Sequence, residues 1–317
     1  MGKWSSEDYV RWMYRSLLAR EADEDGLRHF AGRLDRGDDL RLLVDAIVES
    51  EEFRSKAAVD AVDPLGLSAR QRRPLVIVDV GARVLASEAH IYAPLTTGTL
   101  DWRCIGFEPQ AHRLAERAAA EGDPRLHLID AFIGDGAEGR FHTVSEDGSS
   151  SLLELNTAFN ADFDDIGGMR VVSVETTRTT TLDDALAGED HIDFLKFDIQ
   201  GYEARALRGA TEVLKRTNVI HCEVFFAPMY HGTAFFRDID AMLSEAGFAF
   251  IDFSHLNRYE YVTVPAPTGQ RERLIWGDAV FFRREPATDD DRMAQALIAS
   301  LIYRKNGLAQ AVLRKPG

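Results

Sequence analysis

The chain has 317 residues, of which 45% are apolar and 28% charged, and a formal net charge of −15 at pH 7. This length has room for one large domain and a small one, but not for two large domains. The composition is that of an ordinary globular protein, and an acidic chain without clustered Lys and Arg is poorly suited to bind nucleic acid. No apolar run approaches the roughly 20 residues of a membrane helix, and the N-terminus lacks a signal-peptide pattern. We therefore expect a cytoplasmic protein without stable membrane insertion.

The first part of the chain is predicted to be a small helical bundle. Apolar residues recur at spacings of three and four between positions 9 and 18 and again between 42 and 47. Ser5 and Ser6, followed by two acidic residues, predict a helix N-cap. The segments READEDGL and RGDD interrupt the pattern, which indicates three or four short helices. We expect residues 1–58 to form this bundle and residues 59–73, where the periodicity is lost, to form a linker.

From residue 75 onward, short apolar strands alternate with helical segments. The predicted strands contain, in chain order, LVIVDV, CIGFEP, LHLIDA, FLKFDI, VIHCEVFF, FAFIDF and GDAVFFR. This alternation predicts a doubly wound, parallel α/β sheet in a domain over residues 74–286. GRFHTV and MRVVSVETT predict two more strands, which flank a polar insertion at 145–168. Residues 287–317 are expected to form a C-terminal helical tail.

Residues at the ends of the predicted strands are the candidates for ligand binding. In an open parallel sheet, ligands bind outside the carboxyl ends of the strands, near the point where the strand order reverses. The strand-end residues are Asp79, Gly81, Glu108, Pro109, Asp130, Asp198 and Glu223. This set is rich in carboxylates, and the glycines that a pyrophosphate needs are absent after Gly81. The edge therefore suits a ligand with an adenosine part but no phosphate, such as S-adenosylmethionine.

Three of these positions can be matched to parts of that ligand. Gly81 can let the backbone pass close to the ligand, and Glu108 can accept hydrogen bonds from both ribose hydroxyls. Arg83 could pair with the carboxylate of the methionine part. The alternatives are that Gly81 merely ends a strand and that Arg83 is a solvated surface residue.

The segment IDFLKFDIQGYEARALRGA, residues 192–210, is the most specific motif of the chain, and VIHCEVFFAPMY follows it. Together with VIVDVGA, GFEP, GSSSL and TTLDD, it resembles the FkbM family of S-adenosylmethionine-dependent methyltransferases over residues 74–255. The resemblance implies an α/β class I methyltransferase fold, with a Rossmann-like sheet of seven mostly parallel strands. The last strand, GDAVFFR, would run antiparallel. Members of this family mostly methylate oxygen atoms of sugars, polyketides and other natural products.

The predicted cofactor-binding residues combine positions that match the family with neighbouring residues at the strand ends. The resemblance implies Asp79, Gly81, Glu108, Ser150 and Asp198, and the full predicted set adds Ala82, Arg83, Pro109, Asp130 and Ala131. Residues 149–151 match a loop that closes near the cofactor, and Gly201 and Glu203 complete the signature of the fourth strand. Residues 83–87 depart from the family pattern, which commonly has Asn and another Gly there. That departure leaves a non-catalytic relative as an alternative.

Methylation of a hydroxyl needs an in-line approach to the methyl group and a group that takes the hydroxyl proton. Asp198 is the first candidate for this base, or for orienting the acceptor. The further candidates are Glu223, His221, Tyr230 and His231. Asp198 could instead cap the helix that follows it. His221 is interpreted as a buried core histidine. Two carboxylates without a third ligand make a poor metal site, so no metal is predicted.

The favoured function is O-methylation of a sugar hydroxyl in a glycan or glycolipid precursor, with S-adenosylmethionine as cofactor and S-adenosylhomocysteine as product. The alternative is a non-catalytic scaffold that binds an adenosine ligand and acts through its helical module. A nicotinamide enzyme is disfavoured by the missing glycines. Residues 6–56 resemble a small helical domain of unknown function found in bacterial proteins, some of them tied to surface glycans. We expect this domain to contact a protein partner or a second copy of the chain.

Overall fold

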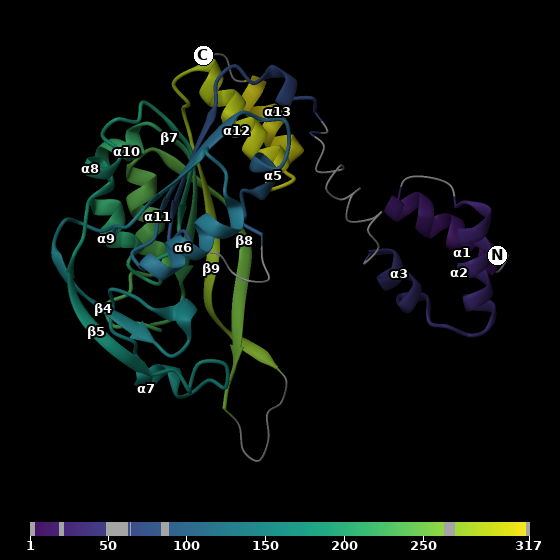
Figure 1. The fold of residues 1–317 in the computed structure, drawn as a ribbon, viewed down its shortest axis with the longest axis horizontal. Helices are drawn as coiled ribbons and strands as arrows, with labels where there is room; N and C mark the ends of the chain where they lie inside the picture. Colours follow the sequence, from purple (N-terminus) through teal and green to yellow (C-terminus); the bar gives the residue numbers. More distant parts are fainter. Residues whose placement is uncertain are drawn as a thin grey trace. The chain divides into compact units, whose positions relative to one another are not determined.

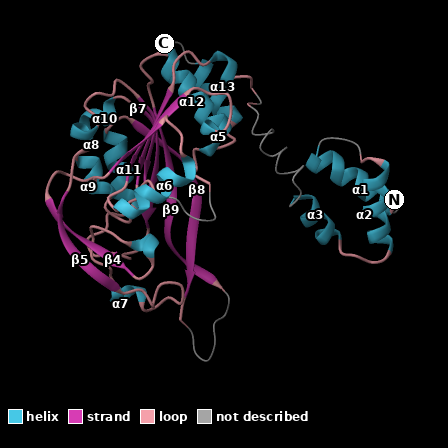
Figure 2. Cartoon of the chain, in the orientation of Figure 1, coloured by secondary structure: helices cyan, strands magenta, loops and turns pink. Residues whose placement is uncertain are grey.

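The computed structural model describes residues 4–18, 22–48, 63, 65–83, 89–262 and 270–314. The chain divides into two compact units, Met1–Gly66 and Leu67–Gly317. Figures 1 and 2 show the helices and strands of each unit. Among the helices that are described, none is both long and apolar enough to cross a membrane.

The first unit is helical, as predicted. Its described elements are α1 (Ser6–Met13), a π-helical turn (Tyr14–Leu18), α2 (Glu24–Asp35) and α3 (Leu40–Val48). Ser5 caps α1, because its side chain accepts a hydrogen bond from the backbone of Asp8, whose carboxylate in turn accepts from the backbone of Ser5. Val10, Met13 and Leu43 are fully buried and bring α1 and α3 into one core.

In the described part of the second unit, seven strands form one sheet in the order β3-β2-β1-β6-β7-β9-β8. The strands are β1 (Leu75–Val80), β2 (Trp102–Phe107), β3 (Leu126–Ile129), β6 (Ile192–Phe197), β7 (Thr217–Phe225), β8 (Phe248–Glu260) and β9 (Arg271–Arg283). The first five are parallel to one another, and β9 is antiparallel to both β7 and β8. This arrangement confirms the predicted doubly wound sheet and its antiparallel strand. The strand order reverses between β1 and β6.

Helices cover the two faces of this sheet. They are α5 (Ala93–Thr96), α6 (Ala111–Glu121), α8 (Leu182–Ala185), α9 (Glu203–Arg208), α10 (Thr211–Lys215), α11 (Phe236–Glu245), α12 (Asp289–Leu301) and α13 (Asn306–Arg314), whereas α7 (Thr157–Asn160) lies in the insertion between β4 and β5. Alternate residues of β1, such as Val76 and Val78, join the core that α8 to α11 complete. The helix α12 contacts β6, β7 and α5, and its residues 294–301 are all buried. The predicted C-terminal tail is helical, and its helix α12 packs on the sheet with α13 beside it.

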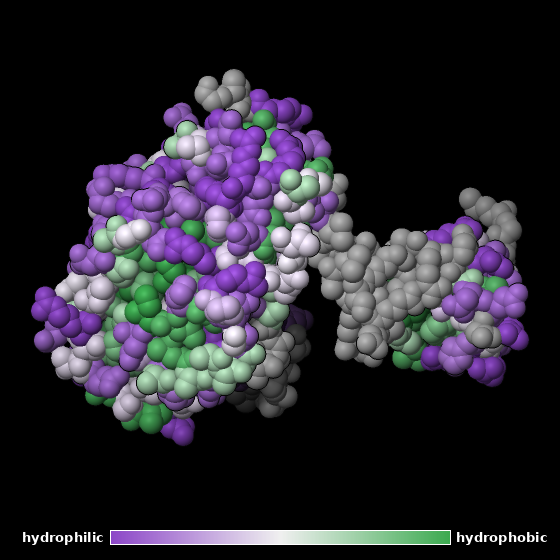
Figure 3. All heavy atoms as spheres, turned by 45° about the horizontal axis from the view of Figure 1, so that its top comes forward, coloured by the Kyte–Doolittle hydropathy of each residue, from purple (hydrophilic) through white to green (hydrophobic). Residues whose placement is uncertain are grey.

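The polar insertion is framed by a small second sheet. The strands β4 (Glu138–Val144) and β5 (Val171–Arg178) pair in antiparallel fashion, where the sequence predicted two extra strands. Ser151 is bridged to His142 of β4, and its hydroxyl donates to the backbone oxygen of Gln200 at 2.8 Å, which holds the loop after β4 near the end of β6. Figure 3 shows one face of the unit, largely hydrophilic, with an area where hydrophobic residues gather.

Candidate functional site

The carboxyl ends of three parallel strands, β1, β2 and β6, lie at one level of the sheet, beside β7. Val80 of β1 is in register with the last residues of β2 and β6, and the last residue of β6 pairs with Cys222 of β7. Gly81, Glu108 and Asp198 directly follow these strand ends, and Glu223 lies beside them within β7, two residues before its last residue. This edge is where the strand order reverses, which is the expected ligand position.

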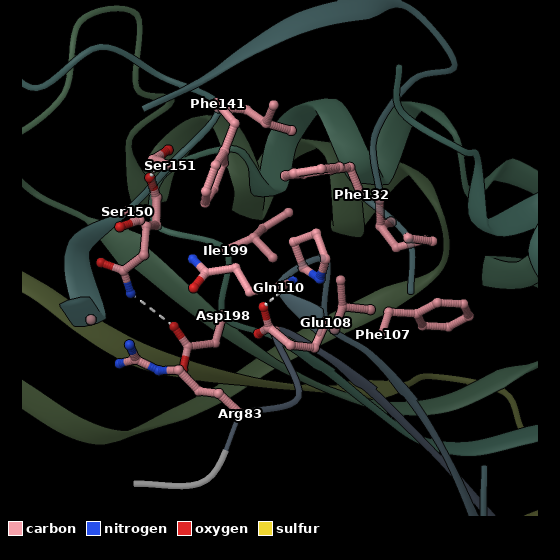
Figure 4. Close-up of a pocket in the computed structure, with 18 residues that line it drawn as sticks. Arg83, Phe107, Glu108, Gln110, Phe132, Phe141, Ser150, Ser151, Asp198 and Ile199 are labelled. Atoms are coloured by element: carbon pink, nitrogen blue, oxygen red, sulfur yellow. Dashed lines mark hydrogen bonds between the residues drawn. The ribbon is translucent and has the colours of Figure 1, made fainter. Parts of the chain in front are cut away.

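Two adjoining hollows lie at this edge. The first, the narrow cleft, has a volume of about 80 Å³ and is drawn in Figure 4. It is lined by Val80, Gly81, Arg83, Phe107, Glu108, Pro109, Gln110, Ala131, Phe132, Ile133, Phe141, Gly148, Ser150, Ser151, Leu152, Asp198, Ile199 and Gln200. The second, the wide hollow, has a volume of about 710 Å³. It is lined by Gly81, Arg83, Ala89, His90, Ile91, Gly148, Ser149, Lys196, Asp198, Gln200, His221, Glu223, Met229, Ser254, His255, Asn257, Tyr259, Trp276 and Asp278.

One side of the narrow cleft is an apolar slot. Phe132 and Phe141 meet edge to face with ring centroids 5.0 Å apart, and Ile199 lies near them on the floor of the cleft (Figure 4). Glu108 stands across from them at the end of β2, 6% exposed, and its Oε1 accepts the backbone N–H of Gln110 at 2.9 Å. Burial raises the pKa of Glu108, although Arg83 and Arg113 oppose the shift. A flat apolar slot beside a buried carboxyl suits an adenosine.

Gly81 is required by the packing of the chain itself. Its φ is +87°, and a Cβ at this position would lie 2.0 Å from the backbone oxygen of Asp198. The absence of a side chain therefore lets the segments after β1 and β6 approach each other. The sequence interpretation assigned this glycine to the approach of a ligand, and the structure adds this second reason.

Asp79 lies beneath the cleft rather than in its wall. Its fully buried carboxylate accepts from Arg117 at 2.8 Å and from the hydroxyl of Tyr92 at 2.7 Å, and Lys196 Nζ lies 3.2 Å away. Burial alone would raise the pKa of Asp79, but Lys196 and Arg117 lower it to about 2. Ala82 is buried beside this group, and its carbonyl also accepts from Arg117. Asp79 and Ala82 thus support the cleft from below.

The remaining predicted cofactor residues fall into two groups. Pro109, Ala131 and Ser150 line the narrow cleft. Asp130 is exposed and does not line it. Residues 84–87, most of the segment that departs from the family pattern, lie outside the described residues. Arg83 lines both hollows and lies against the backbone of Gly148, so it is not simply a solvated side chain.

Asp198 stands where the two hollows meet. Its Oδ2 lies 3.2 Å from Lys196 Nζ, and its Oδ1 accepts from the amide of Gln200 at 2.9 Å. Burial raises the pKa of Asp198, but Lys196, Arg83 and this amide outweigh burial and hold the pKa below its usual range. The carboxylate is therefore ionised at neutral pH. Asp198 is not a helix cap, because α9 begins at Glu203 with Tyr202 as its N-cap.

Gln200 was not predicted, yet it connects the polar residues of the site. Its Nε2 donates to Asp198 and, at 3.2 Å, to Glu223 Oε1, and its Oε1 accepts from the hydroxyl of Tyr230 at 3.1 Å. Gln200 has a φ of +58°, an uncommon conformation for a residue other than glycine. The sequence signal was its place before Gly201 in DIQGYE, where a turn follows a strand.

Buried Glu203 holds this turn in place. Its Oε1 accepts the backbone N–H of Ile199 at 2.9 Å and of Gly201 at 3.3 Å. Burial and the nearby charge of Asp198 raise the pKa of Glu203 to about 7, despite these hydrogen bonds. Glu203 therefore acts on the site through the backbone of the turn.

Glu223 and the two histidines occupy different environments. Glu223 is 4% exposed, and its Oε2 has no hydrogen-bond partner among the described residues. Burial, followed by the charges of Asp198 and Glu203, raises the pKa of Glu223 well above its ordinary value. His221 is buried, as interpreted, with Nδ1 3.0 Å from the hydroxyl of Tyr303; burial lowers its pKa to about 3, helped by the charge of Lys196. His231 is exposed and lines neither hollow.

Within the described residues, no group of three His, Cys, Asp or Glu side chains is arranged to hold a metal ion. The pair Asp198 and Glu223 is linked through the amide of Gln200. A hydrogen-bond bridge thus stands between these two carboxyl groups.

Comparison with known proteins agrees with this geometry. The model of the methyltransferase FkbM domain matches residues 79–250, which is more than half of the chain. The chain belongs to the FkbM methyltransferase family. A domain of unknown function, DUF4214, matches residues 1–57. Both resemblances expected from the sequence are confirmed.

Other proteins show more distant similarity to this FkbM-family chain. The 2-O-methyltransferase NoeI of Sinorhizobium fredii (strain NBRC 101917 / NGR234) is 30% identical over 169 residues, which cover 50% of this chain and 66% of that protein, just under two thirds. The methyltransferase FkbM of Methylobacillus flagellatus KT matches with a TM-score of 0.37 and 15% identity over 85% of this chain and 58% of its own. A magnesium protoporphyrin IX methyltransferase from Synechocystis PCC 6803, solved with bound S-adenosylmethionine, has a TM-score of 0.34 and 10% identity, covering 88% and 99%.

Proposed function

We propose that this chain transfers a methyl group from S-adenosylmethionine to a hydroxyl oxygen of a sugar, in a glycan or glycolipid precursor. Family membership supports the transfer, and the similarity to a 2-O-methyltransferase supports oxygen as the acceptor atom. The observation that carries the proposal is the position of Asp198, an ionised carboxylate that lines both hollows. A donor in one hollow and an acceptor in the other would meet beside it.

The narrow cleft fits the adenosine part of the cofactor. The slot between Phe132, Phe141 and Ile199 would hold the purine, and Glu108 would accept hydrogen bonds from the ribose hydroxyls. The ligand has no phosphate, so the cleft does not need the glycine-rich turn of a dinucleotide site. Arg83, at the junction of the hollows, is the candidate partner for the methionine carboxylate.

When bound, S-adenosylmethionine supplies a methyl group on a positively charged sulfur. Asp198 would accept the proton of the sugar hydroxyl while the oxygen of that hydroxyl bonds to the methyl carbon. The electron pair of the broken C–S bond would stay on sulfur. The products are a methyl ether, a protonated Asp198 and neutral S-adenosylhomocysteine. Lys196 keeps the carboxylate ionised beforehand, and Gln200 fixes its orientation.

The proposal is tested by incubating the full chain with S-adenosylmethionine carrying a deuterated methyl group and a bacterial glycan and glycolipid extract. We expect the label in a sugar methyl ether, identified by mass spectrometry after hydrolysis. The Asp198→Asn variant is the control for enzymatic transfer. Tight cofactor binding without labelling of any sugar fraction would contradict the proposal and favour a non-catalytic scaffold.

We also propose that residues 1–58 serve as an interaction module for a protein partner or a second copy. The match to DUF4214 and the compactness of this unit support a separate role. Size-exclusion chromatography with light scattering should show a smaller oligomer, or loss of a copurifying partner, when residues 1–66 are removed. Unchanged assembly after this deletion would contradict the module role.

A further inference from the structure

We propose that the wide hollow is a binding site for a neutral sugar ring, with Trp276 as its stacking platform and Asn257 as a hydrogen-bonding residue that sets acceptor specificity. The inference rests on the proposed methyl transfer and assigns the acceptor end of that site. The supporting features are the ladder of β8 and β9, the unpartnered oxygen of Glu223, and the charges around the hollow.

The ladder of β8 and β9 provides a wall that extends beyond the rest of the sheet. The pairing of β7 with β9 ends at Phe225 and Trp276, whereas β8 and β9 stay paired as far as Glu260 and Arg271. Figure 1 shows these two strands running past the end of their neighbours. Because Glu223 lies near the end of β7, the extended wall rises next to the carboxyl groups of the site.

Irregular pairing along β8 brings polar side chains to the hollow. The register shifts between Phe253 and His255, so the side-chain alternation changes at Ser254. Upstream, Phe253 packs against the core under α11. Downstream, His255 and Asn257 line the hollow and are paired with Asp278 and Trp276 of β9. Because of this bulge, β8 presents apolar side chains to the core before Ser254 and polar side chains to the wide hollow after it.

The indole of Trp276 is fixed but not covered. Its Nε1 donates to the hydroxyl of Tyr259 at 3.0 Å, and the side chain is only partly buried. The ring of His255 lies 5.3 Å from it, centroid to centroid. An aromatic ring held by its polar edge offers a flat apolar face, and Asn257 beside it offers both donors and an acceptor. This combination matches a sugar ring, which has an apolar C–H face and a rim of hydroxyls.

Glu223 supplies a polar contact at the inner end of the hollow. Its buried Oε2 has no hydrogen-bond partner among the described residues, although the residue lines the hollow. Buried polar atoms are nearly always paired, so a ligand hydroxyl is the natural partner here. Because Gln200 joins Glu223 to Asp198, a hydroxyl held by Glu223 would keep its neighbour close to the proposed base.

The charges around the hollow favour a neutral ring. Lys196 lies 3.2 Å from both Asp79 and Asp198, so its charge is already shared by two carboxylates. The wall also contains the ionised carboxylate of Asp198 and the carboxyl group of Asp278, and its other cation, Arg83, is assigned to the methionine carboxylate of the cofactor. An acidic sugar would bring another negative charge to this wall and be repelled. We therefore assign neutral hexoses or deoxyhexoses rather than uronic acids or sugar phosphates.

The test uses the full chain saturated with S-adenosylhomocysteine and titrated with methyl glycosides of neutral hexoses, of a deoxyhexose and of a uronic acid. Ligand-observed saturation-transfer NMR detects binding without relying on tryptophan emission. We expect at least one neutral glycoside to bind saturably and the uronide not to bind. Trp276→Ala and Asn257→Ala should each weaken that binding by about tenfold or more, with unchanged affinity for S-adenosylhomocysteine.

Two control variants separate the subsite from general effects. Leu256→Ala changes the residue between His255 and Asn257 that does not line the hollow, and Trp12→Ala removes an exposed tryptophan of the helical unit. Both should bind the glycoside like the wild type. Failure of every neutral glycoside to bind, preference for the uronide, or wild-type binding by both test variants would overturn the inference.

The outcomes also distinguish this inference from the proposed function. Sugar binding that depends on Trp276 and Asn257, in a protein that methylates no sugar, would retain the subsite and refute the methyl transfer. Methylation of a sugar with the same KM in the wild type and both variants would retain the function and refute the subsite.

Discussion

The narrow cleft and the wide hollow share a junction but are built in different ways. The cleft is lined by residues at or just after the ends of β1, β2, β3 and β6, together with Phe141 of β4 and the loop that follows β4. The wide hollow takes much of its wall from β8 and β9, more than 50 residues beyond Asp198 in the chain. Under the proposed function, the cofactor would be held mainly at the strand ends of the parallel sheet, and the acceptor would be held largely by β8 and β9.

Asp198 belongs to both regions, so replacing it should have the largest effect. Asp198→Asn keeps the shape and hydrogen-bonding capacity but removes the base, and turnover should fall by roughly 10²- to 10⁴-fold. Affinity for S-adenosylmethionine, measured by calorimetry, should stay within a few-fold. Normal turnover with a lowered melting temperature would show that the carboxylate is structural only.

Glu108 belongs to the narrow cleft alone and should separate the two regions. Glu108→Ala should weaken S-adenosylmethionine by roughly 1–3 kcal/mol, the scale of a lost hydrogen bond to a charged group. The KM for the acceptor should not change once the cofactor is saturating. Calorimetry on the folded variant checks this, and an unchanged dissociation constant would remove Glu108 from ribose binding.

Gln200 joins the two regions without being the base. Gln200→Ala should lower kcat on the order of tenfold, because Asp198 and Glu223 lose their common hydrogen-bond donor. Cofactor affinity should be nearly unchanged. The amide lowers the pKa of Asp198, so its removal should move the acid limb of the kcat profile to higher pH. A variant that loses only thermal stability, with no change in the pH profile, would contradict this positioning role.

Glu203 links the turn between the two regions to the pH dependence of stability. The folded state raises the pKa of Glu203 to about 7, so between its ordinary value and pH 7 the folded chain holds a proton that the unfolded chain has lost. Its contribution therefore favours folding at low pH and is lost as the pH rises through 7. Between pH 5 and pH 8, the wild type should therefore lose on the order of 1–3 kcal/mol more free energy of unfolding than the Glu203→Gln variant does.

Urea unfolding at several pH values measures this difference. Glu245→Gln, at an exposed position, provides the control. It should leave the dependence of the free energy of unfolding on pH unchanged. If the free energy of unfolding changes with pH equally in the wild type and in Glu203→Gln, then Glu203 stays ionised in the folded protein.

Arg83 should give the smallest effect. If it pairs with the methionine carboxylate from its partly exposed position, Arg83→Ala should weaken S-adenosylmethionine by up to about 1 kcal/mol. Decarboxylated S-adenosylmethionine, which lacks that group, should be affected less. Calorimetry with both ligands and both proteins closes a thermodynamic cycle. A coupling of zero would mean that the methionine end is held by other groups.

The sequence by itself determined the strand ends of this protein. Parallel strands of similar length end at a common edge, so the apolar runs before Gly81, Glu108, Asp198 and Glu223 were enough to place these residues together. The family motifs lie in the same segments, which is why the family, the sheet and its antiparallel strand were all predicted. Local patterns also placed the first helices and the cap at Ser5, since these depend on neighbouring residues only.

Tertiary structure alone decided the direction in which side chains at that edge point and what stands opposite them. The side chain of Asp79 lies beneath the cleft because its buried partner there is Arg117 of α6, 38 residues later in the chain. Gln200 gains its role from a positive φ and from Tyr230, and His231 is exposed although it follows directly in the chain. The wall around Trp276 depends on a bulge in β8 and on pairing with β9, and long-range pairings of this kind leave no periodic signal in the sequence.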